Sequence, residues 1–164
     1  IKAFSYFEIA ANMGNADALN YLGIISNNGL SKSKDIEQAI KYYTQAIEKG
    51  DKRYAPGNLG AIYYNELAYK DYEKAYSYFK IAEENKNTDA MNMIAYMKAL
   101  AQGTEHNLVE ALYHINKAIT ISPDNISYWD SKGEILLMST TSSGILRFFL
   151  IDFKGLPFFI NCMT

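Results

Sequence analysis

The sequence predicts an all-α protein, a right-handed superhelical α-solenoid built from antiparallel helix pairs. Two observations support this prediction. A pattern of two alanines that flank an aromatic pair recurs along the chain with a period of 36 residues, in four copies. Within a copy, the apolar residues recur in steps of three and four, which places them on one stripe of a helix. A repeat of this length indicates a stacked array whose units bury their stripes only against one another.

The repeated pattern belongs to the second helix of each predicted unit. It is clearest in the segments IEQAIKYYTQAIEKGD, from Ile36, and YEKAYSYFKIAEENKN, from Tyr72. Alanine at every seventh position lets two helix backbones approach, and the aromatic pair fills the space around them. The four copies are Ala3, Tyr6, Phe7 and Ala10; Ala39, Tyr42, Tyr43 and Ala46; Ala75, Tyr78, Phe79 and Ala82; and Ala111, His114, Ile115 and Ala118.

Residues that start and stop helices mark the ends of these second helices. Asp35, Asp71 and Asn107 each precede one and can accept hydrogen bonds from the free amides of its first turn. Gly50 can adopt the left-handed conformation that ends a helix. Together with the first helices, these signals predict helices at 2–13, 16–28, 36–49, 55–67, 71–85, 88–102, 107–121 and 125–138.

The first helix of each unit carries a small residue at one fixed place. Glycine inside a helix costs about 1 kcal/mol relative to alanine, so we expect a neighbouring helix to pack closely there. The four segments are DALNYLGIIS, APGNLGAIYY, DAMNMIAYMK and YWDSKGEILL, and their small residues are Gly23, Gly60, Ala95 and Gly133.

The stretch from Leu22 to Asp51 resembles a Sel1-like repeat of the tetratricopeptide-like superfamily. It contains a Leu-Gly pair, a glycine turn, an aspartate before the second helix, two adjacent aromatics, an alanine and a closing glycine. The 16 residues from Gly23 to Ala39 fit the longer loops of Sel1-like units better than those of tetratricopeptide repeats. The resemblance covers residues 1–138, an array of about four units of which the first is incomplete.

The resemblance implies an interaction scaffold whose first helices line a concave face and hold other proteins, with no catalysis and no cofactor. On that face, asparagine can donate to and accept from an extended peptide backbone, and tyrosine adds apolar area with a polar tip. The alternative, that these side chains are merely solvated, stays open. The predicted partner-binding residues are Asn20, Ile24, Tyr54, Tyr64, Asn92, Tyr96, Asp130 and Glu134.

Charge and motifs weigh against other classes of function. A net charge of -2 and an isoelectric point near 5.7 leave no basic excess for nucleic acid or an anionic membrane surface. The chain has no glycine-rich phosphate loop, nucleophile elbow or paired-cysteine metal spacing. His106, Glu110 and His114 share a helical stripe, but His114 replaces an aromatic of the repeat. We therefore expect no metal site.

Two alternative functions remain open. Some cysteine-rich Sel1-like proteins have been proposed to hydrolyse cell-wall-like substrates, but this chain has a single cysteine, Cys162. Helical-pair arrays of similar period also bind single-stranded RNA, which requires a basic concave face. The paired cysteines and the basic face are both missing here, so we favour a protein or peptide partner.

One cysteine permits no internal disulfide. Because cytosolic proteins and many exported proteins both lack disulfides, the compartment stays undetermined, with the cytoplasm favoured. The chain begins with Ile-Lys in mid-repeat, which indicates a processed or truncated product whose leader would not be seen.

The segment 139–164 departs from the repeat. It contains none of the 18 alanines and none of the 14 tyrosines, but five of the eight phenylalanines. One interpretation makes it the second helix of a terminal unit, with Ser143 as the cap and Gly155 as the stop. The other is an artificial or frame-shifted end of a longer array. A membrane span is not expected, because charged residues interrupt a stretch that is already too short.

Overall fold

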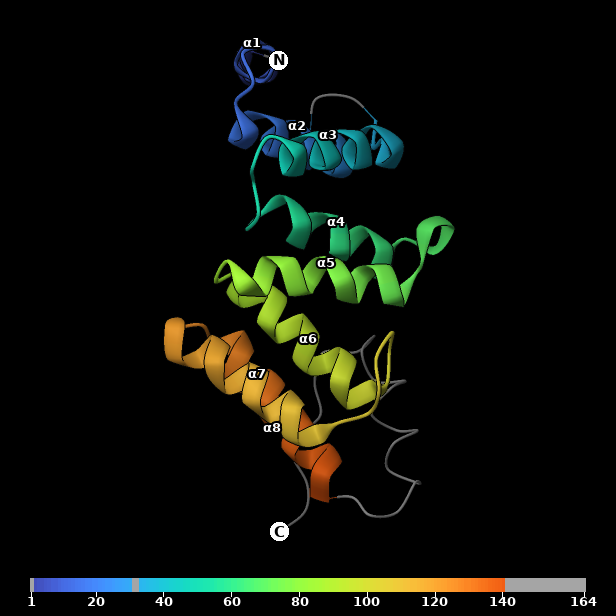
Figure 1. The fold of residues 1–164 in the computed structure, drawn as a ribbon, viewed down its shortest axis with the longest axis vertical. Helices are drawn as coiled ribbons and strands as arrows, with labels where there is room; N and C mark the ends of the chain where they lie inside the picture. The colour runs from blue at the N-terminus through green and yellow to red at the C-terminus, as the bar shows by residue number, and fades with distance from the viewer. Residues whose placement is uncertain (1, 31–32, 141–164) are drawn as a thin grey trace.

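The computed structural model describes residues 2–30 and 33–140, and these residues form helices joined by short turns (Figure 1). The elements are α1 (Lys2–Asn12), α2 (Ala16–Asn28), α3 (Ile36–Glu48), α4 (Ala55–Asn65), the 3-10 helix η1 (Leu67–Tyr69), α5 (Tyr72–Glu84), α6 (Thr88–Leu100), α7 (Leu108–Ile121) and α8 (Ile126–Thr140). Every predicted helix is confirmed, with its ends within two residues of those expected, whereas η1 was not predicted. The two interpretations of the C-terminal segment concern residues that lie outside the described range from 141 onward.

The helices stack in one column, with α1 and α8 at opposite ends (Figure 1). Helices α2 and α3, α4 and α5, and α6 and α7 form the most extensive pairs, and α3 with α4, α5 with α6, and α7 with α8 join successive pairs. Helix α6 also contacts α8, so the first helices of neighbouring units touch. This arrangement confirms the predicted α-solenoid.

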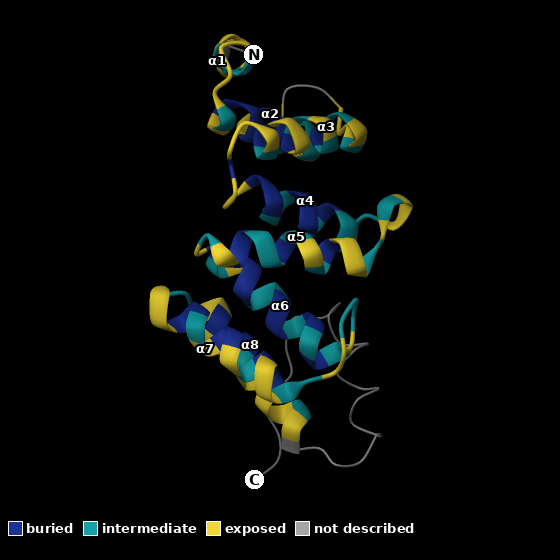
Figure 2. Ribbon diagram, viewed as in Figure 1, coloured by how far each residue is buried: buried dark blue, intermediate teal, exposed yellow. Residues whose placement is uncertain are grey.

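The repeated alanines lie in the buried faces between helices (Figure 2). From α3 onward they have no exposed surface, and the second aromatic or apolar residue of each pair is equally buried. These residues are Ala39, Tyr43, Ala46, Ala75, Phe79, Ala82, Ala111, Ile115 and Ala118. The sequence period therefore marks one interface that recurs along the stack.

The small residues of the first helices admit the aromatic rings of the second helices. A Cβ added to Gly23 would lie 2.5 Å from the Tyr43 ring, and one added to Gly60 would lie 3.0 Å from the Phe79 ring. Ala95 is fully buried. Gly133 is exposed and has no described atom within 4 Å of an added Cβ, and the second helix expected to pack against it falls outside the described residues.

Two series of caps begin the helices, each with the period of 36 residues. The side chains of Asp35, Asp71 and Asn107 accept hydrogen bonds from backbone amides three residues later, which confirms the predicted caps of the second helices. The first helices have their own series, which was not predicted: Asn15 and Asn87 accept from amides three residues later, and Asp51 accepts from three successive amides. Side-chain oxygens thus satisfy backbone amides at the starts of helices α2 to α7.

Replacing Lys86 with glycine is expected to stabilise the fold by about 1 kcal/mol. Gly14, Gly50 and Lys86 occupy one repeated turn position with φ values of 85°, 103° and 63°, so the lysine is held in the left-handed conformation. Glycine adopts that conformation without a steric cost. Thermal denaturation should show a higher Tm for Lys86→Gly. The control Lys49→Gly, at a residue whose φ is -84°, should show no gain. A lower Tm for Lys86→Gly would contradict the expectation.

Candidate protein-binding surface

The eight predicted binding residues lie on, or directly before, the first helices α2, α4, α6 and α8, but their exposure differs. Tyr54 and Asp130 are exposed. Asn20 is buried, with 7% of its surface exposed. The rest are half-buried: Ile24, Tyr64, Asn92, Tyr96 and Glu134. We call the partly or fully accessible residues of this set, together with Asp17 and Asp89, the first-helix surface.

The expectation that Asn20 is an exposed groove residue is wrong. Its Oδ1 accepts a hydrogen bond of 2.9 Å from Nδ2 of Asn58, which lies on the next first helix. Ile24 packs against the hydrophobic cluster that Leu19, Tyr43 and Leu59 help to form. Both side chains are therefore used mainly to join α2 to the rest of the stack.

Two of the predicted tyrosines also connect neighbouring units. The Tyr64 hydroxyl donates to Gln102 Oε1 over 2.7 Å, and the Tyr96 hydroxyl donates to Glu134 Oε2. Burial raises the pKa of both phenols, and in Tyr96 the hydrogen bond to Glu134 raises it further. The two hydroxyl groups thus stay protonated donors. Because their rings are only half-buried, each tyrosine holds two units together and still presents part of its ring to solvent.

Tyr54 is open to solvent, whereas Asn92 is half-buried. Tyr54 is 51% exposed at the start of α4, and the Arg53 guanidinium lies 5.0 Å from its ring centroid. Asn92 is in the middle of α6, and its Oδ1 is enclosed yet has no hydrogen-bond partner among the described residues. An enclosed acceptor without a donor costs free energy in the folded protein.

The first-helix surface carries accessible acidic groups, and the exposed Arg53 lies beside Tyr54. Asp17, Asp89 and Asp130 are exposed. Lys98 of α6 is bound instead to Glu110 of α7 over 2.7 Å. Lys132 of α8 lies over the Trp129 ring.

The described residues contain no group of three or more histidine, cysteine or acidic side chains that could hold a metal ion. His106 is exposed, whereas His114 is buried, with its Nδ1 2.6 Å from Oε1 of Glu83. The histidines that share a stripe in the sequence thus lie in different surroundings. Within the described ranges, no helix has both the length and the apolar character needed to span a membrane.

A model of the Sel1 repeat matches the chain at residues 1–15, 16–51, 58–87 and 88–120. The chain belongs to the Sel1 repeat family. The matched segments coincide with α1 and with the pairs α2 and α3, α4 and α5, and α6 and α7. Sel1 repeats form helical scaffolds that typically bind other proteins. Among curated proteins, no sequence matches this chain significantly.

Solved structures of Sel1 repeat proteins have the same fold. The Sel1 repeat protein of Oxalobacter formigenes superposes with a TM-score of 0.71 and 26% identity, over 80% of this chain and 53% of its own. The protective antigen c5321 of uropathogenic Escherichia coli displays an SLR fold. It superposes with a TM-score of 0.64 and 28% identity, over 70% of this chain and 25% of its own. Cysteine-rich protein B of Helicobacter pylori superposes with a TM-score of 0.58 and 22% identity, over 80% of this chain and 91% of its own. At that identity, the similarity shows the fold alone. The chain thus spans about half and a quarter of the first two proteins.

The sequence did not reveal which residues of the same chain form hydrogen bonds with the predicted binding residues. Asn58 and Gln102 each lie 38 residues from the predicted residue that they contact, as Glu134 does from Tyr96. A comparison of polar residues at that offset would have found these pairs. The offset is two residues longer than the repeat period of 36, so it joins residues at different repeat positions of neighbouring units.

Proposed function

We propose that this Sel1 array is a non-catalytic scaffold that binds a polypeptide along the first-helix surface, with Tyr54, Tyr64, Asn92 and Tyr96 as the central contacts. The observation that carries the proposal is the set of accessible tyrosine rings on the first helices of two neighbouring units, Tyr54 and Tyr64 at the two ends of α4 and Tyr96 on α6. An extended chain can pack its side chains against these rings, while its backbone groups bond to accessible polar side chains beside them.

The rigidity of the surface supports this proposal. The hydrogen bonds of Tyr64 and Tyr96 hold both rings in place before a partner arrives. A preorganised aromatic side chain loses little conformational entropy on binding, and such side chains often dominate interface energies. Asp130 and Glu134 at the α8 end direct the preference toward a basic or neutral segment.

Substitution of the central tyrosines is expected to weaken binding by more than about 1 kcal/mol. A partner is first isolated with the intact protein from its native source, and its affinity is then measured by titration calorimetry for Tyr54→Ala, Tyr64→Ala and Tyr96→Ala. Circular dichroism confirms that each variant is folded. Tyr113→Ala is the matched control, because Tyr113 is 61% exposed on the second helix α7.

Two outcomes would overturn the proposal. One is unchanged affinity in the three tyrosine variants together with loss in Tyr113→Ala, which would move the site to the second helices. The other is tight binding of single-stranded RNA that falls steeply with salt, which would assign the array to a different class of ligand. Hydrolysis of a cell-wall-like substrate by the purified protein would likewise contradict a non-catalytic scaffold.

A further inference from the structure

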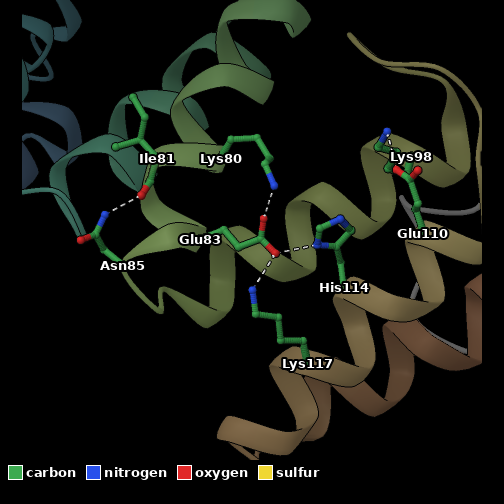
Figure 3. A network of polar contacts seen from close by, with 8 residues as sticks. All are labelled: Lys80, Ile81, Glu83, Asn85, Lys98, Glu110, His114 and Lys117. Carbon is green, nitrogen blue, oxygen red and sulfur yellow. Dashed lines mark hydrogen bonds and ion pairs between the residues drawn. The ribbon is translucent and has the colours of Figure 1, made fainter.

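A buried ionic cluster joins α5 to α7 (Figure 3). Glu83 is 3% exposed, and its Oε1 lies 2.6 Å from His114 Nδ1 and 3.3 Å from Lys117 Nζ. Its Oε2 lies 2.6 Å from Lys80 Nζ. Three donors from two helices thus satisfy a carboxylate that would be costly to bury alone. We call the contact between α5 and α7 the ionic joint.

The equivalent repeat positions on α3 and α5 carry no charge. Glu83 and His114 lie 36 residues after Ile47 and Tyr78, and both of these pack against the same hydrophobic cluster. The chain therefore departs from its own repeat at both partners of a single contact. A buried ion pair often contributes less to stability than apolar side chains of similar volume. We expect the ionic joint to be weaker than an apolar contact at the same place.

Glu83 is the acceptor shared by all three basic side chains of the ionic joint. Lys98 and Glu110 form a separate pair over 2.7 Å, so they largely offset each other. Lys80 and Lys117 reach the carboxylate from opposite helices and are only partly exposed. The remaining titratable or charged groups near the cluster are Tyr76 and Glu84 on α5 and Tyr113 on α7.

We propose that the ionic joint is an acid-sensitive hinge of the array. Protonation of Glu83 removes the negative charge that attracts His114, Lys80 and Lys117. The two lysines then face each other across the joint without a counter-charge, and their repulsion favours opening. The equivalent positions on α3 and α5, Ile47 and Tyr78, carry no carboxylate, so we expect no such opening there. This hinge is independent of the proposed polypeptide binding.

The direction of the pH effect follows from the Glu83 carboxyl. Burial acts to raise its pKa, but hydrogen bonds from His114 and Lys80 outweigh burial and lower the pKa to about 2. When the joint opens, the carboxyl regains its ordinary pKa of 4.5. The open joint therefore binds protons more readily than the closed one. Glu83 stabilises the closed joint fully above pH 4.5, and this contribution is lost as the pH falls toward 2. Over that range, the equilibrium constant for closing the joint falls by a factor on the order of 100.

Hydrogen exchange followed by mass spectrometry tests the hinge. Protection factors of amides in α7, corrected for intrinsic exchange, are compared with those in α3 at pH 6 and pH 3. For the natural sequence, the α7-to-α3 ratio should fall at least 10-fold on acidification. The double variant Glu83→Ile, His114→Tyr copies Ile47 and Tyr78, so its ratio should stay within about twofold. The variant retains Asp71 and Glu110, so acid effects from these carboxyls remain in both proteins.

A fall of the ratio in the double variant equal to that in the natural sequence would overturn the proposal, as would a constant ratio in the natural sequence. Glu83→Gln keeps the test decisive if the double variant does not fold. Its neutral amide should lower the α7-to-α3 ratio already at pH 6 and make it insensitive to acid. A Glu83→Gln protein that behaves like the natural one at both pH values would also reject the hinge.

Discussion

Replacing Gly103 with alanine is expected to destabilise the protein by about 3 kcal/mol or more, because the new Cβ would collide with backbone. An added Cβ would lie 2.2 Å from the carbonyl oxygen of Tyr72 and 2.8 Å from the amide nitrogen of Glu73. Neither atom can move without disturbing the first turn of α5. Gly103 also has a φ of 65°, which alanine adopts only with strain.

A matched variant separates the collision from the backbone strain. Gly14 has a φ of 85°, and no described atom lies within 4 Å of a Cβ added there. Gly14→Ala should therefore cost only the strain of the left-handed conformation, about 1 kcal/mol. Urea denaturation of both variants gives the two free energies of unfolding. Equal losses would show that the loop before α7 moves freely away from α5.

The repeat period was enough to predict the helices, their second-helix caps and the buried alanines. Each of these depends on local chemistry that recurs with the repeat, such as Asp71 before α5 or Ala75 in its buried face. The period also predicts which contacts repeat, since a stack buries the same face in each unit. For this reason the helix ends were correct to within two residues.

The exposure of the candidate site could not be predicted in the same way. Helical position alone placed Asn20 on an open face, whereas the crossing of α2 and α4 brings Asn58 to it and buries it. The same limit applies to Glu83, which takes an apolar position of the repeat and depends on His114, 31 residues later. Contacts between helices depend on crossing geometry, and a single sequence does not contain that geometry.

The first-helix surface combines binding with internal support, which affects how its variants are interpreted. Removing the whole ring of Tyr64 removes both a contact surface and the hydrogen bond to Gln102. Tyr64→Phe removes only the hydroxyl and so isolates the support. A binding loss that appears in the alanine variant but not in the phenylalanine variant belongs to the ring itself.

Enlarging a repeated alanine is expected to destabilise the array by about 1 to 3 kcal/mol, through overpacking. Ala46 and Ala75 have no exposed surface, and the backbone oxygen of Ala75 lies 3.2 Å from a Cβ added to Gly60 of the facing helix. Leucine at either position would have to push two helices apart along their contact.

Thermal melts of Ala75→Leu and Ala46→Leu measure this cost, with Lys34→Ala as the control. Lys34 forms an ion pair of 2.7 Å with Glu66, but its side chain is 51% exposed, so its removal should change the Tm very little. Similar losses in the two leucine variants are expected, because both alanines are fully buried between helices, Ala75 as the first and Ala46 as the second alanine of its copy of the repeat. A Tm for Ala75→Leu equal to that of the natural sequence would mean that neighbouring helices do not approach at the alanines, and the stacking described for α4 and α5 would then be wrong.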